Sequence, residues 1–336
     1  MARFLPTLFI LALASCCFLP SVDMNQYQDE YTSQTQFAPN SLPTHDSVKV
    51  TYLGVSTLLI DDGTTQILID GWFSRFGAIK LGFGRLATDT QRVDHQLETY
   101  GIDRVKAIFV THTHIDHAGD VGYVAEKTGA ELHGTMSTAN VGLGYGLPRD
   151  QVKLFQPHQP IAFGKFKVTA IPSIHTPTIP FINHQTRVFV DANTFQKKKA
   201  VNQRKYREGG SYDFLVEHGD LSILIKPSTH FIPGALDNYK ADVVFLGIAL
   251  AGRQNEAFQD AHYRESITAT SPSLVIPIHW DSFTGDWKPG ELKALPRLID
   301  RDFPKALDRL VGHLKTDSID CKILQGGYSI MLFGEE

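Results

Sequence analysis

Short apolar runs recur along the chain from residue 48 onward, and clusters of turn-forming residues separate them. Runs rich in Val, Ile, Leu and Phe are typical of strands. They predict strands at 48–53, 56–61, 66–70, 107–110, 130–133, 154–155, 161–163, 166–172, 212–216, 221–226, 241–246 and 274–279, and a final strand pair within 322–332 that turns at Gly326-Gly327. Other segments predict helices at 89–100, 121–127, 255–268, 292–300 and 304–314.

Two longer segments between these elements allow more than one interpretation. Trp72 to Leu86 is an apolar loop that could line a substrate groove or pack under the sheet. Thr176 to Ser211 is long for a connection within a compact domain. It could be a lid over a site or a plain surface insertion, and both remain open.

The N-terminus has the pattern of a targeting segment. Arg3 precedes an apolar run from Phe4 to Ala14 that is too short to span a membrane. Leu13-Ala14-Ser15-Cys16 resembles the lipobox of bacterial lipoproteins, which implies cleavage before Cys16 and its lipidation. An ordinary secretory signal is the alternative. We therefore expect a leader at 1–16, a flexible tether at 17–47 and one domain at 48–336, in a periplasmic or outer-membrane lipoprotein of the bacterial envelope, or in a secreted protein.

Composition, net charge and cysteine count limit the kinds of protein and partner that this chain can represent. Of the 336 residues, 42% are hydrophobic and 20% charged, which is ordinary for a globular protein. The net charge of −4 argues against a nucleic-acid partner, and the short basic run Lys197-Lys198-Lys199 favours a solvated surface. Three cysteines do not make a disulfide framework, and Cys321 is expected to be a small buried hydrophobe.

The most closely spaced candidate metal ligands lie in Thr111-His112-Thr113-His114-Ile115-Asp116-His117, directly after the predicted strand 107–110. His112 and His114 alternate with Thr113 and so point the same way, whereas Asp116 and His117 lie where a helix begins and face elsewhere. Neutral imidazoles and carboxylates are the usual ligands of zinc. The cluster therefore predicts a metal site with ligands for one ion and for a neighbouring ion, in preference to a polar loop that happens to contain histidines.

His112-x-His114-x-Asp116-His117 resembles the signature loop of the metallo-β-lactamase superfamily. The resemblance extends from about Val48 to about Leu332. It implies an α/β fold, the four-layer αββα sandwich, with a metal site at one edge of the sheets.

The resemblance also implies further site residues. His175, just past a predicted strand, and His279, at the end of one, match the next metal ligands, and His184 is a competitor of His175. Asp70 matches a strand-end carboxylate that orients a ligand. The family's bridging aspartate is replaced by Ser228, so that Ser228 or His230 is an uncertain contributor. The implied sets are His112, His114 and His175 for the first metal, and Asp116, His117 and His279 for the second.

The stretch Ile276 to Asp281 looks most like the branch that contains ascorbate-6-phosphate lactonase and N-acyl phosphatidylethanolamine phospholipase D. The expected protein is a hydrolase with one or two zinc ions, in which a zinc-activated water attacks an ester, lactone or phosphodiester. A small-molecule or lipid-derived substrate is expected.

With one metal, Asp116 could accept the proton of the attacking water. Asp281 is a weaker acid–base candidate, and a capping or loop hydrogen bond is the alternative for it. A metal-binding or sensory protein without turnover is the second functional class, and an iron redox protein is a third.

Overall fold

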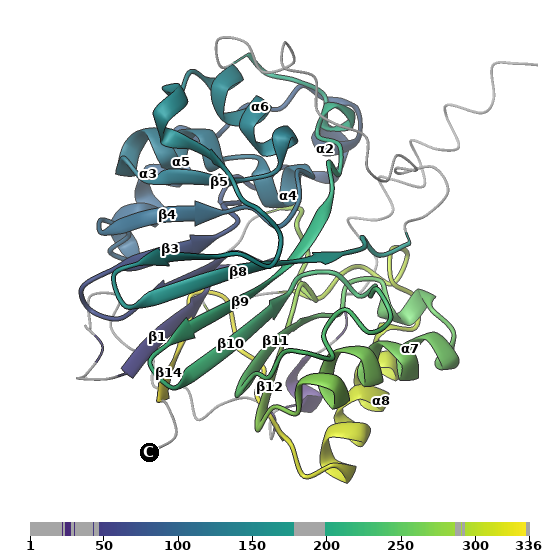
Figure 1. The fold of residues 1–336 in the computed structure, drawn as a ribbon. Helices are drawn as coiled ribbons and strands as arrows, with labels where there is room; N and C mark the ends of the chain where they lie inside the picture. The colour runs from purple at the N-terminus through teal and green to yellow at the C-terminus, as the bar shows by residue number, and fades with distance from the viewer. Residues whose placement is uncertain are drawn as a thin grey trace, which may run out of the picture.

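The computed structural model describes residues 22, 24–27, 30, 43, 47–177, 199–285, 290 and 293–333. Over these residues, two mixed β-sheets face each other and helices cover the outer face of each sheet (Figure 1). This arrangement confirms the predicted α/β class and αββα sandwich. The predicted leader and most of the predicted tether lie outside the described residues. No helix in the described ranges is long and apolar enough to cross a membrane.

The first sheet has the strand order β14-β1-β2-β3-β4-β5-β6. Its first four strands are antiparallel, and the pairs from β3 to β6 are parallel. The bounds are β1 Ser47–Tyr52, β2 Leu58–Asp61, β3 Gln66–Ile69, β4 Val105–Phe109, β5 Glu131–Gly134, β6 Val152–Leu154 and β14 Ser329–Phe333. Parallel strands place their carboxyl ends at one edge, which is where β3 and β4 lead into Asp70 and the histidine cluster.

The second sheet has the order β13-β12-β11-β10-β9-β8-β7. Strands β7 to β10 are antiparallel neighbours, whereas β10 to β13 run parallel. The bounds are β7 Pro160–Phe163, β8 Phe166–Ser173, β9 Ser211–His218, β10 Leu221–Lys226, β11 Val243–Gly247, β12 Leu274–Ile278 and β13 Asp320–Cys321. The predicted hairpin from β9 to β10 turns at Gly219, whose φ of +60° suits glycine.

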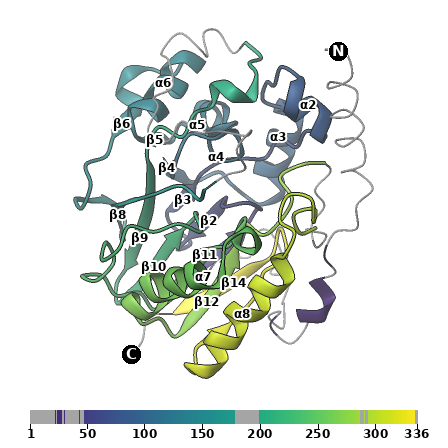
Figure 2. The same ribbon diagram turned by 90° about the vertical axis from the view of Figure 1, so that its right-hand side faces the viewer.

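The helices divide between the two outer faces (Figures 1 and 2). Helices α3, α5 and α6 lie over the first sheet, and α7 and α8 lie over the second. The α-helix bounds are α2 Ala78–Phe83, α3 Thr90–Thr99, α4 Ile115–Ala118, α5 Val121–Thr128, α6 Met136–Tyr145, α7 Glu256–Tyr263 and α8 Phe303–Thr316. One apolar core fills the space between the sheets and continues under α8, and a second lies between the first sheet and its helices.

Two sequence predictions near the C-terminus are wrong. Residues 293–300 form no helix, because Ala294 and Leu295 instead pair with the backbone after His279, and Pro296 follows. The expected strand pair within 322–332 is also absent. Strand β13 joins the second sheet and β14 the first, so the chain crosses between the sheets at this point.

Candidate metal centre

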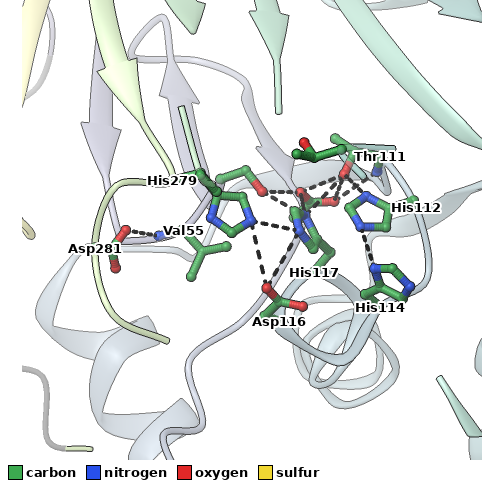
Figure 3. A network of polar contacts seen from close by, with 12 residues as sticks. Val55, Thr111, His112, His114, Asp116, His117, His279 and Asp281 are labelled. Atoms are coloured by element: carbon green, nitrogen blue, oxygen red, sulfur yellow. Dashed lines mark hydrogen bonds and ion pairs between the residues drawn. The ribbon is translucent and has the colours of Figure 1, made fainter. Parts of the chain in front are cut away.

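Imidazoles from three strand ends meet at one edge of the sandwich. Figure 3 shows those that follow β4 and β12. His112 and His114 follow β4 in the first sheet. His175 follows β8 and His279 follows β12, both in the second sheet. Asp116 and His117 belong to the one-turn helix α4, for which His114 is the N-cap residue. The centre is therefore assembled across both sheets.

The first group consists of His112, His114 and His175. His112 Nε2 lies 3.1 Å from His114 Nδ1, and the same Nδ1 atom lies 3.1 Å from His175 Nε2. His175 Nδ1 lies 2.8 Å from the carbonyl oxygen of Thr176. Since that oxygen can only accept, His175 donates there and turns the lone pair of Nε2 toward the other two rings.

The second group consists of Asp116, His117 and His279. The two Nε2 atoms of His117 and His279 are 3.2 Å apart. Asp116 Oδ2 lies 3.8 Å from His117 Nε2 and 3.7 Å from His279 Nε2, so the carboxylate points toward both rings (Figure 3). The ring centroids of His112 and His117 are only 3.8 Å apart, so the two groups adjoin.

The donor atoms fit a divalent cation. Nitrogen ligands about 2.0–2.1 Å from a tetrahedral ion are separated from each other by roughly 3.3 Å. The nitrogen separations of 3.1 and 3.2 Å in the two groups are close to that spacing. Three nitrogens in the first group and two nitrogens with an oxygen in the second are donor sets that zinc and similar ions accept.

Asp70 contacts Nδ1 of His117, the ring nitrogen that does not face His279. Its Oδ2 lies 2.8 Å from His117 Nδ1 and accepts from Ser56 Oγ at 2.5 Å, and its Oδ1 accepts from the Thr111 amide at 2.8 Å. This carboxylate–histidine contact fixes the tautomer that turns Nε2 toward His279. The structure thus places Asp70 as a partner of His117, outside both ligand groups.

Burial keeps most of these imidazoles neutral. It is the main cause that holds the pKa values of His112 and His114 well below 6.5, and it lowers the pKa values of His175 and His279 to about 4. Burial also opposes protonation of His117, but the carboxylates of Asp70 and Asp116 outweigh it, and the net pKa is raised. Four rings therefore carry free lone pairs at neutral pH, as metal binding requires.

Other residues named from the sequence lie elsewhere. His230 is in neither group, because its Nδ1 accepts from the Phe231 amide and its ring packs against Phe258. Ser228 is buried, and within the described residues no hydrogen bond joins it to either group. Asp281 takes the alternative role of a loop hydrogen bond, accepting from Val55 N at 2.8 Å. His184 lies outside the described residues.

The apolar loop after Asp70 is mostly packed into the core. Trp72, Phe73 and Phe76 are buried, and the loop continues into α2, which the sequence did not indicate. Ser56 and Thr111, which donate hydrogen bonds to Asp70, were also not predicted as site residues. Of these, only Thr111 could have been suspected from the sequence, because it is a polar residue directly beside the histidine cluster.

Comparisons with known proteins agree with this geometry. Residues 50–193 match the model of the metallo-beta-lactamase superfamily. A UPF0173 metal-dependent hydrolase from Pyrococcus furiosus is 32% identical over 121 residues, covering 32% of this chain and 46% of the relative. Another from Thermus thermophilus is 33% identical over 110 residues, covering 29% of this chain and 42% of the relative. The chain thus aligns with less than half the length of these relatives.

Solved structures share the fold at low identity. A metallo hydrolase from the archaeon Ignicoccus hospitalis has a TM-score of 0.53 at 15% identity, covering 86% of this chain and 100% of that one. An isothiocyanate hydrolase from Delia radicum gut bacteria has a TM-score of 0.51 at 14% identity, covering 85% of this chain and 100% of that one. At these identities the likeness concerns the fold alone.

Proposed function

We propose that this chain is a member of the metallo-β-lactamase superfamily and a zinc-dependent hydrolase of esters, lactones or phosphodiesters. The observation that carries the proposal is the convergence of two adjoining three-residue groups, each with donor atoms spaced for one divalent ion. The metal-dependent hydrolases among its relatives support the reaction class. Substrate choice is not fixed by the fold.

Each residue would contribute in its own way. His112, His114 and His175 would hold one ion, and Asp116, His117 and His279 the other. A bound divalent cation lowers the pKa of a water molecule toward neutrality and polarises a substrate oxygen. Asp70 keeps His117 in the tautomer that can bind, and Thr176 does the same for His175.

Asp116 is the residue placed to move a proton. Its side chain is 16% exposed, whereas that of His117 is 1% exposed, so water reaches this carboxylate more easily. Burial raises its pKa, but the electrostatic interactions with the rings of His117, His279 and His114 outweigh this effect, and the net pKa is lowered. Asp116 is therefore ionised at neutral pH and can accept a proton from attacking water when the second ion is absent.

The test is metal content and hydrolysis by the purified full-length chain. We expect close to two equivalents of zinc by elemental mass spectrometry, and hydrolysis of at least one of an ester, a lactone and a phosphodiester probe. His114→Ala removes a central ligand and should lower turnover by at least about 100-fold together with loss of metal. His95→Ala is the matched control, because His95 is exposed on α3.

The outcomes separate the functional classes. Wild-type protein without metal after reconstitution would overturn the proposal. Metal retained without turnover on all three probes would favour a binding or sensory protein, which the serine at the expected bridging position also favours. About one equivalent would assign the metal to His112, His114 and His175 and make Asp116 the candidate base.

An envelope location completes the proposal. The apolar N-terminal run and Cys16 support lipid anchoring to a bacterial membrane, with an ordinary secretory signal as the alternative. A small-molecule or lipid-derived substrate would suit that location, and the net charge gives no support for nucleic acid.

A further inference from the structure

A second polar network lies behind His279, on the side away from His117 (Figure 3). Its centre is Asp281, which is fully buried. Asp281 Oδ1 accepts from the Tyr52 hydroxyl at 2.5 Å and from the Val55 amide at 2.8 Å. Both donors belong to the first sheet or to the turn after β1, whereas Asp281 follows β12 of the second sheet. The network therefore joins the two sheets at the edge that carries the metal centre.

The same two partners of Asp281 hold the backbone of His279. The His279 amide donates to the Val55 carbonyl at 2.8 Å and approaches the Tyr52 hydroxyl at 3.3 Å. Tyr52 and Val55 therefore each contact both Asp281 and the backbone of His279. Since Asp116 and His117 lie in α4, which follows β4 of the first sheet, this junction sets where His279 lies relative to them.

Arg75 places its positive charge beside the buried carboxyl group of Asp281. Its Nη1 lies 3.8 Å from Asp281 Oδ2, and the two side chains are 1% and 0% exposed. The guanidinium also donates to the carbonyls of Ser282 and Leu53, both at 3.4 Å. A Cβ at Gly54 would lie 2.4 Å from Arg75 Nη2 and 3.0 Å from Asp281 Oδ2, so glycine is what allows the pair to sit on this turn.

Two residues of this network have a strained backbone conformation. Val55 has φ of +57° and His279 has φ of +57°. A left-handed conformation is rare for any residue with a Cβ and rarer for a β-branched one. Such residues persist only where their surroundings hold them. Asp281 holds the Val55 amide, and Val55 in turn holds the His279 amide, so the carboxylate fixes both strained residues.

We infer that Arg75 and Asp281 are positioning residues, whose buried ion pair holds His279 in place for metal binding by the second group. This inference rests on the metal centre of the proposed function and adds two residues to it. Asp281 belongs to neither ligand group. The pair acts through Val55 and Tyr52, and the first group, whose His175 comes from β8, does not depend on it.

Asp281→Asn tests this role, because an amide oxygen can still accept from Tyr52 and Val55 while Arg75 loses its counter-charge. The probe is Co²⁺ titrated into metal-free protein against a chromophoric chelator, which yields two affinities. His279→Ala identifies which of the two belongs to the second group. We expect Asp281→Asn to weaken that affinity by about 10–100-fold and to leave the other unchanged.

A double variant tests whether the two charges act as a pair. Arg75→Met combined with Asp281→Asn should bind the second ion no worse than Asp281→Asn alone, because the effects of a true pair are not additive. If Asp281→Asn does not fold, Tyr52→Phe removes a single hydroxyl and should weaken the same affinity to a smaller extent.

The control is Asp61→Asn, which breaks the 2.8 Å pair of Asp61 and Arg104 at the far end of β2. It should lower stability without changing either affinity. Unchanged affinities in Asp281→Asn together with lowered stability would overturn the inference alone, because the pair would then only stabilise the fold. Wild-type protein that binds no Co²⁺ would overturn the proposed function, and the inference with it.

Discussion

At the scale of single residues, three strained positions lie in or beside the second ligand group. Asp70 has φ of +54°, and Val55 and His279 share the same left-handed region. Each costs on the order of 1–3 kcal/mol, so the fold must hold them by other contacts. Asp70 is held by its bonds with Ser56 and Thr111, and in that conformation its carboxylate reaches His117. The strain at Asp70 therefore serves the orientation of the His117 imidazole.

Asp70→Asn should lower both the pKa of His117 and the affinity of the second group. Asp70 raises the His117 pKa by its charge and its hydrogen bond, so its removal leaves Asp116 alone to oppose the lowering of that pKa by burial. Loss of the carboxylate partner should weaken metal binding by about 10–100-fold. NMR titration of His117 in metal-free protein and chelator competition measure the two effects.

Glu131→Gln is the matched control for Asp70→Asn. Glu131 Oε2 lies 2.8 Å from His133 Nε2, which makes a second carboxylate–histidine pair outside the metal centre. The substitution should lower the pKa of His133, because Glu131 raises it against the effect of burial. An unchanged His117 pKa in Asp70→Asn would contradict the orienting role of Asp70.

At the scale of elements, α8 shows which interactions attach a helix to this sandwich. Its buried residues recur at helical spacing and share one face toward the second sheet: Phe303, Ala306, Leu307, Leu310, Val311 and Leu314. Arg309 on the other side reaches Asp260 of α7 through two bonds of 2.7 Å. These side chains are 30% and 40% exposed, so water screens the pair. Apolar burial should therefore dominate the attachment.

Two substitutions compare these contributions. Leu307 is 1% exposed, and Leu307→Ala should reduce the free energy of unfolding by about 2–5 kcal/mol through lost burial and a cavity. Asp260→Asn should reduce it by less than about 1 kcal/mol. Urea unfolding at pH 7 measures both. A larger effect of Asp260→Asn would mean that the ion pair, not the apolar face, holds α8.

At the scale of the whole molecule, the sequence predicted most strands and the place where ligands gather. Apolar runs identified β1 and β3 within about a residue, because a buried strand cannot tolerate polar positions on its core face. The cluster after β4 was visible because its members are adjacent in sequence. The structure also brings His175 and His279 beside it, although their role as ligands stays a prediction.

What the sequence could not reveal are contacts between distant segments. Arg75 and Asp281 are far apart in the chain and carry no local pattern, so only the packing of the two sheets brings them together. The same limit explains the wrong final strand pair. Gly326-Gly327 does begin a reversal, but the Gly327 amide donates to Tyr52, which directs the next strand to the first sheet.

Asp300 couples the stability of the whole fold to pH. Its side chain is fully buried before α8, and a Cβ at Gly252 would lie 2.5 Å from its Oδ1. Burial raises its pKa from 3.8 to about 7, against the opposing charge of Arg253. The folded protein therefore keeps this proton between pH 3.8 and about 7, whereas the unfolded chain releases it. Stability from this group is complete below pH 3.8 and is lost as pH rises toward 7.

Asp300→Asn should remove this dependence, since the amide resembles the protonated carboxyl but has no proton to lose. Relative to wild type, the variant should match at pH 4 and gain stability as pH rises to 8, on the order of a few kcal/mol. Urea unfolding at pH 4, 6 and 8 measures the difference. Asp220→Asn, in the exposed turn between β9 and β10, should show no such trend. A pH-independent difference between Asp300→Asn and wild type would mean that Asp300 is ionised throughout, held by Arg253 strongly enough to offset its burial.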